Sequence, residues 1–209
     1  MFSHETLNNT LRAVSASLRT PVIILLLLAI AVSVIMVGTL IAELFTERMR
    51  LRVKLPRLVD RLRQTDVDVK AVIQESGLLR RQRQSLLKLV EDTTLSMELR
   101  EALARRLLFE EKARYDKITG VTDLIAKLGP MLGLLGTLIP LGPGLIALGQ
   151  GDTYTLSTSL LSAFDTTVAG LACAAVAHVV STVRRRWYAN YTVAEETVME
   201  ALLDWEERQ

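Results

Sequence analysis

The chain has 209 residues, of which 50% are hydrophobic, 5% aromatic and 23% charged, with 25 Lys and Arg against 23 Asp and Glu. A net charge of +2 excludes a disordered polyelectrolyte and gives no reason to expect a nucleic acid as partner. The single cysteine, Cys173, excludes an intrachain disulfide framework and a multi-cysteine metal site. Apolar and charged residues are segregated along the chain, which predicts several membrane spans beside a charged segment.

The first apolar stretch runs from Val22 to Ala42, 21 residues without a charge. About 20 helical residues cross a hydrocarbon core of about 30 Å, so this stretch is long enough to span. A cleaved signal peptide is the alternative, because Arg12 and Arg19 precede the stretch. The run is longer than a typical signal core and no clear cleavage site follows it. We therefore expect a short N-terminal segment at residues 1–20 and a retained span at residues 21–44.

Two further apolar stretches follow, at residues 128–148 and 156–183, separated by a turn at residues 149–155. The first is rich in glycine and proline, and we expect it to kink or end near Pro140 to Pro143. The second has Asp165 and His178 as its only ionisable side chains, and its length predicts that it tilts or projects from the bilayer. Arg184, Arg185, Arg186 and Trp187 come next and are typical of a basic and aromatic interfacial anchor.

The distribution of positive charge predicts the topology. Residues 45–127 hold nineteen Lys and Arg, whereas residues 1–20 hold two and residues 149–155 hold none. The positive-inside rule places residues 45–127 and the tail at 184–209 in the cytoplasm, with the N-terminus and the turn outside. We thus expect a multi-pass protein of the inner or plasma membrane.

The predicted cytoplasmic parts have helical periodicity and almost no strand signal, so the fold class is all-α. Asp66 is a candidate cap for a short helix that ends at Glu75. In the tail, Val198, Leu202 and Trp205 share one side, which predicts a terminal helix that extends the third span.

No enzyme constellation, metal site or cofactor motif is found, since His4 and His178 are too few and too separated. What remains is polar side chains at membrane depth, where an ionisable group costs about 3 kcal/mol or more. Helical spacing puts Asp165 and Thr167 on different faces of the third span. For Asp165, a structural hydrogen bond between helices and a role on an ion path both stay open. For a threonine, the alternative is a hydroxyl bonded back to its own helix.

The segments GPMLGLLGTLIPLGPG and SLLSAFDTTVAGLACAAVAHVVSTVRRRWY resemble the MotA/TolQ/ExbB proton-channel family. The resemblance implies a homopentamer around two copies of a single-span partner of the ExbD, TolR or MotB kind. It also implies that threonines of the second and third spans line the inner lumen, which maps onto Thr137 and Thr167, with Thr166 as an adjacent candidate. Relatives of the TolQ and ExbB kind have a glutamate where this chain has Ser162, whereas this chain has Asp165 instead.

We therefore expect three transmembrane helices with a helical cytoplasmic domain, assembled as a homopentameric bundle in the lipid bilayer and driven by ions, most simply protons. The alternative is a membrane scaffold that recruits cytoplasmic partners without conducting ions. A secondary transporter lacks support because no inverted repeat is found, and an intramembrane enzyme because no nucleophile and base are paired.

Overall fold

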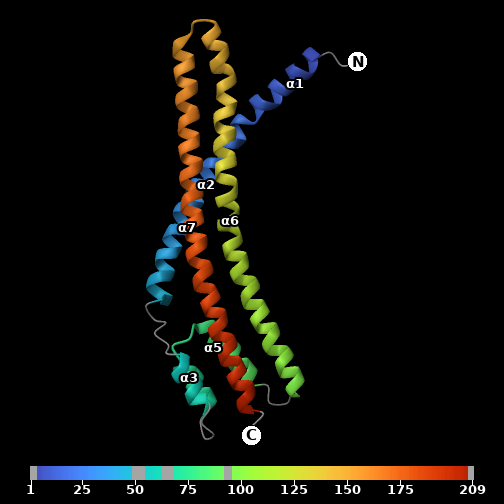
Figure 1. Cartoon of the computed structure of the whole chain (residues 1–209), viewed down its shortest axis with the longest axis vertical. Coiled ribbons are helices and arrows are strands. Elements are labelled where there is room, and N and C mark those ends of the chain that lie inside the picture. Colours follow the sequence, from blue (N-terminus) through green and yellow to red (C-terminus); the bar gives the residue numbers. More distant parts are fainter. Residues whose placement is uncertain (1–3, 49–54, 63–67, 92–95, 207–209) are drawn as a thin grey trace. The chain divides into compact units, whose positions relative to one another are not determined.

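The computed structural model describes residues 4–48, 55–62, 68–91 and 96–206, and within these ranges every regular element is a helix (Figure 1). This confirms the all-α class for the described residues. The elements are α1 (His4–Ser17), α2 (Arg19–Glu43), the π-helix η1 (Leu44–Arg48), α3 (Leu55–Leu62), α4 (Val69–Glu75), α5 (Arg80–Glu91), α6 (Met97–Gly149) and α7 (Thr153–Glu206).

Three of the described helical segments are long and apolar enough to cross a membrane, at residues 9–46, 97–149 and 153–205. They contain the three apolar stretches of the sequence in α2, α6 and α7. In α2 one face is buried, formed by Val22, Leu26, Ser33 and Met36. Most of the other large apolar side chains of α2 are exposed, which is the pattern of a helix whose outer surface meets lipid rather than water.

Helix α6 is continuous over 53 residues and includes Pro130, Pro140 and Pro143. We expected the second apolar stretch to kink or end near Pro140 to Pro143; an end there is wrong, because the helix continues to Gly149, and a kink stays a prediction. The chain reverses at Gly151, whose φ of +73° is a left-handed conformation that glycine adopts without strain.

Asp152 directly precedes the last helix, α7. Its carboxylate accepts hydrogen bonds from the Thr155 backbone N–H at 3.0 Å and from the Thr155 hydroxyl. These bonds favour the charged form and lower the pKa of Asp152 below its usual value. The turn thus ends in an N-cap that is charged at neutral pH.

The contacts divide the chain into two units, which we describe separately. We call residues 1–38 and 120–181 the apolar unit, and residues 39–119 and 182–209 the polar unit. The apolar unit holds most of α2, the second part of α6 and the first part of α7. The polar unit holds the end of α2, η1, α3, α4, α5, the beginning of α6 and the end of α7.

The polar unit has a core of apolar side chains from α3, α4, α5, α6 and α7. Its most buried members include Leu62, Ile73, Leu86, Leu89, Val198, Met199 and Leu202. The predicted tail helix is confirmed: α7 continues to Glu206, Val198 and Leu202 are buried, and Trp205 packs against the same core.

The short helix that was expected to end at Glu75 does so, but its cap differs from the prediction. Asp68 is the N-cap, and its carboxylate accepts bonds from the backbone N–H groups of Lys70 at 3.1 Å and Ala71 at 3.3 Å. Asp66 lies outside the described residues. Asp68 is preferred because its oxygen reaches the first turn of a helix that begins at Val69.

Candidate functional site

In the apolar unit, α6 and α7 run antiparallel and touch through their backbones (Figure 1). A Cβ added to Gly170 would lie 2.6 Å from the Gly129 carbonyl oxygen and 2.8 Å from the Gly133 Cα. No side chain larger than hydrogen fits there without moving a helix. Gly129 and Gly133 of the second apolar stretch therefore serve close helix packing, which in lipid supplies the association that the hydrophobic effect cannot.

Thr166 lies in this contact face. A Cβ added to Gly136 would lie 2.6 Å from the Thr166 Cβ, so the threonine side chain fills the space that the glycine leaves. The Thr166 hydroxyl donates to carbonyl oxygens of its own helix, at 2.9 Å for Ala163 and 3.1 Å for Ser162. Within the chain, Thr166 is a packing residue.

Thr137 directly follows Gly136, and Thr167 directly follows Thr166. Gly136 and Thr166 both lie in the contact face. One residue is a rotation of about 100° in a right-handed helix. Because α6 and α7 run in opposite directions, the residue that follows a contact residue points to the same flank of the helix pair on α6 as on α7. Both side chains are half-buried. The two threonines thus lie on one flank of the helix pair.

The hydroxyls of these two threonines are bonded back to their own helices. The Thr137 hydroxyl donates to the Leu134 carbonyl oxygen at 2.7 Å, and the Thr167 hydroxyl donates to the Ala163 carbonyl oxygen at 3.1 Å. A hydroxyl that donates in this way keeps its lone pairs available as acceptors.

The two ionisable side chains of the third apolar stretch lie apart. Asp165 precedes Thr166 and therefore lies on the flank opposite to Thr167, with an exposed side chain. His178 is eleven residues after Thr167, about three helical turns, and is also exposed within the chain. The structure does not bring Asp165 together with Thr137 and Thr167. Among the described residues, no group of three or more His, Cys, Asp or Glu is placed to hold a metal ion.

In the polar unit, Arg184 is buried rather than spread on a surface. Its Nε lies 3.0 Å from Glu43 Oε2 and one of its terminal nitrogens lies 2.9 Å from the Thr39 hydroxyl. The Arg184 side chain is 8% exposed and that of Glu43 18%. The Tyr188 hydroxyl donates to the other Glu43 oxygen at 2.6 Å, so the carboxylate is satisfied from two sides.

The Tyr188 ring continues this cluster to α6. It stacks on the Tyr115 ring with centroids 4.3 Å apart and an interplanar angle of 17°. The end of α2 is thereby joined to α7 by a buried ion pair, and α7 to α6 by an aromatic stack. We call these residues, Thr39, Glu43, Tyr115, Arg184 and Tyr188, the charged cluster.

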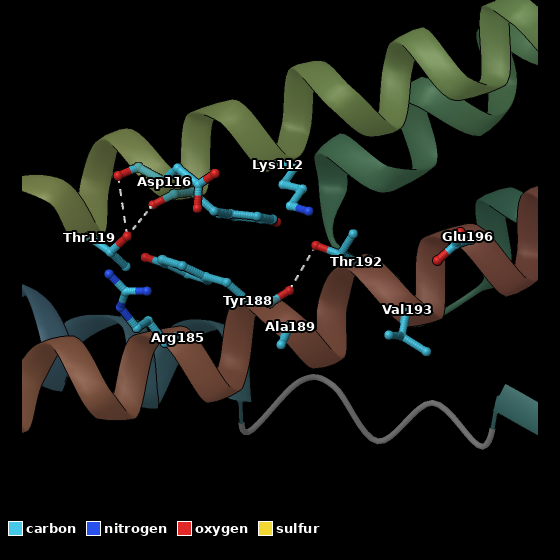
Figure 2. Close-up of a pocket in the computed structure, with 10 residues that line it drawn as sticks. Lys112, Asp116, Thr119, Arg185, Tyr188, Ala189, Thr192, Val193 and Glu196 are labelled. Carbon is cyan, nitrogen blue, oxygen red and sulfur yellow. Dashed lines mark hydrogen bonds between the residues drawn. The ribbon is translucent and has the colours of Figure 1, made fainter.

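A groove of about 390 Å³ adjoins the charged cluster between α6 and α7 (Figure 2). Figure 2 shows Tyr188 between Arg185, which lies near Thr119, and Lys112 farther along the groove. Two cations and two carboxylates line it, Lys112 and Arg185 against Asp116 and Glu196, so its charge is balanced. Of the predicted interfacial anchor, Arg185 and Arg186 are exposed and Trp187 is half-buried, and their contact with lipid stays a prediction.

Sequence reasoning missed the partner of Arg184. Glu43 directly follows the 21-residue uncharged stretch of α2, and Arg184 directly follows the third apolar stretch. Two opposite charges at the ends of two apolar stretches are a signal that could have indicated the pair.

The family model described as the MotA/TolQ/ExbB proton channel family matches residues 72–196, which are 125 of the 209 residues. The match includes both helices of the glycine contact and the three threonines. No curated protein matches the chain.

Proposed function

The chain belongs to the MotA/TolQ/ExbB proton channel family, and we propose that it forms a homopentamer that drives a single-span partner by ion flow. The family membership implies a proton-channel role in an energy-transducing membrane complex. Within that role, the proposed partner is of the ExbD, TolR or MotB kind, present as two copies inside the pentamer. Proton passage at the interface between pentamer and partner rotates the pentamer relative to the partner.

The observation that carries the proposal is the position of Thr137 and Thr167 on one flank of the antiparallel pair. With five copies around an axis, that flank forms a ring of hydroxyls. Such a ring offers hydrogen-bond acceptors and donors without a fixed charge, which suits a surface past which a partner's proton-carrying group moves. Thr166 packs against Gly136 and is proposed to support the ring rather than to line it.

Asp165 is proposed to lie off this path. It is on the opposite flank of α7, which faces away from a lumen lined by Thr137 and Thr167. An ionisable group in a span is costly unless it is paired or hydrated, so a hydrogen bond to the neighbouring copy gives it a function in assembly.

The charge pattern supports a topology in which the N-terminus is outside and the C-terminus is in the cytoplasm. Residues 45–127 and 184–209 then form a cytoplasmic helical domain. One charge that crosses 100 mV releases about 2.3 kcal/mol, so several protons are needed for each mechanical step.

The test is proton flux into liposomes that contain the purified complex of this chain with a single-span partner. Replacing both Thr137 and Thr167 by valine is expected to abolish flux while the pentamer still forms, because valine keeps the shape and removes the hydroxyl. The matched control is Thr158→Val on α7, the helix of Thr167. It removes an exposed hydroxyl that is bonded back to its own helix and is expected to leave flux unchanged.

Two outcomes contradict the proposal. Full flux in the double valine variant removes the threonines from the pathway. Flux from the unaltered complex that equals that of empty liposomes favours the membrane scaffold without ion conduction.

A further inference from the structure

Glu195 occupies a core position in the polar unit. On α7, the residues Tyr191, Glu195, Val198 and Leu202 recur at the spacing of one helical face. Val198 and Leu202 are 0% and 1% exposed, and Glu195 is also 0% exposed. A carboxyl group therefore stands where the pattern of the helix requires an apolar side chain.

The surroundings of Glu195 compensate a charge only weakly, through the nearby hydroxyl of Ser85. Neither of its carboxylate oxygens has a hydrogen-bond partner among the described residues. An unpaired buried ion is far more costly than an unpaired neutral group, so the neutral acid is the form that fits this site. Burial raises the pKa of Glu195 to about 7, and the negative charge of Glu111 adds to the rise, whereas the nearby Ser85 hydroxyl opposes it.

The groups that face Glu195 come from two neighbouring helices. Helix α6 contributes the like charge of Glu111 and α5 contributes the uncharged Ser85. Of the charged residues of α5, the Arg83 side chain donates to the Gln74 carbonyl oxygen at 3.0 Å, and the others are exposed, namely Arg80, Arg81, Lys88 and Glu91. None of these side chains pairs with Glu195, whose carboxylate oxygens have no hydrogen-bond partner among the described residues.

The same surface holds α5 against α7. The buried Gln82 side chain of α5 donates to the Tyr191 carbonyl oxygen at 2.8 Å, one turn from Glu195. Leu86 and Leu89 lie on the same face of α5 and belong to the core. The seam between α5 and α7 thus combines apolar contacts, one buried hydrogen bond and one buried acid.

We propose that Glu195 is a protonation switch that controls the docking of α5 on α7. With the carboxyl group neutral, α5 is docked and the seam is dry. When the carboxyl group releases its proton to water, the carboxylate requires hydration, and α5 separates from α7 to admit water. The closed seam is therefore most stable in acid, and it loses stability as the pH rises to neutrality.

This switch goes beyond the proposed motor and does not depend on it. It concerns the polar unit, and it holds whether or not protons cross the apolar unit. If the motor proposal is correct, protons delivered to the compartment of the polar unit favour the closed seam, which makes the subunit responsive to the pH of that compartment.

The test is hydrogen–deuterium exchange of the whole chain in lipid nanodiscs between pH 4.5 and 8.5, with rates corrected for the intrinsic effect of pH. Protection of residues 80–91 is expected to fall by up to about tenfold for each pH unit as the pH rises to about 7 and to level off above it, because only in that window does the docked state hold a proton that the open state has released. Glu195→Gln keeps the shape without the charge and is expected to leave protection constant over the whole range.

The matched control is Glu196→Gln, which removes a carboxylate from the adjacent, exposed position and is expected to behave as the unaltered chain. Where Glu195→Gln fails to fold, Glu111→Gln decides: removing the like charge stabilises the ionised, docked form, so the loss of protection is expected to be smaller and to end at a lower pH. Protection of α5 that is independent of pH in the unaltered chain, or a loss of protection that Glu111→Gln leaves unchanged, would overturn the switch.

Discussion

The two units of the chain pack their helices by opposite rules. In the apolar unit, α6 and α7 meet through glycine and threonine, while large side chains such as Leu134, Phe164 and Val168 are exposed. In the polar unit, leucine, isoleucine and valine fill the interior and most charges lie outside. The difference follows from the solvent: in water burial of apolar area drives packing, whereas in lipid only close contact and polar bonds do.

A second difference concerns buried charge. The polar unit accepts an ion pair at Glu43 and Arg184 and a lone acid at Glu195 in its interior. Where α6 and α7 meet in the apolar unit, the threonine hydroxyls of α7 donate hydrogen bonds to the backbone of their own helix. The polar unit is therefore expected to respond to pH and to charge substitutions, and the contact between α6 and α7 in the apolar unit to side-chain volume.

The largest expected effect tests whether the contact between α6 and α7 limits side-chain volume. Gly170→Leu places a side chain where even a Cβ would meet the Gly129 carbonyl oxygen at 2.6 Å, so the helix pair cannot close and no folded protein is expected in detergent. Gly142→Leu in α6 is the control, because a Cβ at Gly142 has no atom within 4 Å. Size-exclusion chromatography with thermal unfolding distinguishes the two. A folded Gly170→Leu protein would show that the contact is not required.

Breaking the buried pair is expected to have the next largest effect. Arg184→Met leaves the Glu43 carboxylate buried without its cation and is expected to cost about 3–5 kcal/mol of unfolding free energy. The double variant with Glu43→Met is expected to recover most of this loss, since neither charge is then left unpaired. A double-mutant cycle measured by denaturant unfolding checks the coupling, and additive losses would show that the two charges act independently.

The third prediction concerns pH and the polar unit. Because burial raises the pKa of Glu195 from 4.5 to about 7, the folded state holds this proton more tightly than the unfolded state. The unfolding free energy is therefore expected to fall as pH rises from about 4.5 to 7, by about 3 kcal/mol at about 1.4 kcal/mol for each pH unit. Unfolding curves at several pH values measure it. In Glu195→Gln this fall should vanish, and an unchanged slope would assign the pH dependence to other groups.

The helices and the apolar stretches could be predicted from the sequence because both are local patterns. Charge-free runs and helical periodicity are visible within windows of about 20 residues. The continuous course of α6 through Pro140 was not predictable in this way, since proline tolerance depends on the neighbouring helix. The cap at Asp68 shows the same limit, because two aspartates two residues apart are equally good candidates until the first turn is placed.

The site was less predictable than the fold. Thr137, Thr166 and Thr167 were selected by resemblance, and only the contact geometry separates the packing role of Thr166 from the flank of the other two. Glu43 and Arg184 are 141 residues apart, so no local window joins them. Glu195 violates the apolar pattern of its own helix, and such a conflict between residue type and position is a signal that sequence reasoning can look for.

The smallest expected effect sharpens the contrast between buried and exposed charge within the polar unit. Arg105 and Glu101 form an ion pair at 3.1 Å, almost the distance of the Arg184 and Glu43 pair, but their side chains are 81% and 48% exposed. Arg105→Gln is expected to cost less than about 0.5 kcal/mol, because water solvates both groups when the pair is broken. The measurement is the denaturant unfolding used for Arg184→Met. A comparable loss in the two variants would mean that burial does not set the strength of ion pairs in this unit, and the contrast between the two pairs would then need another cause.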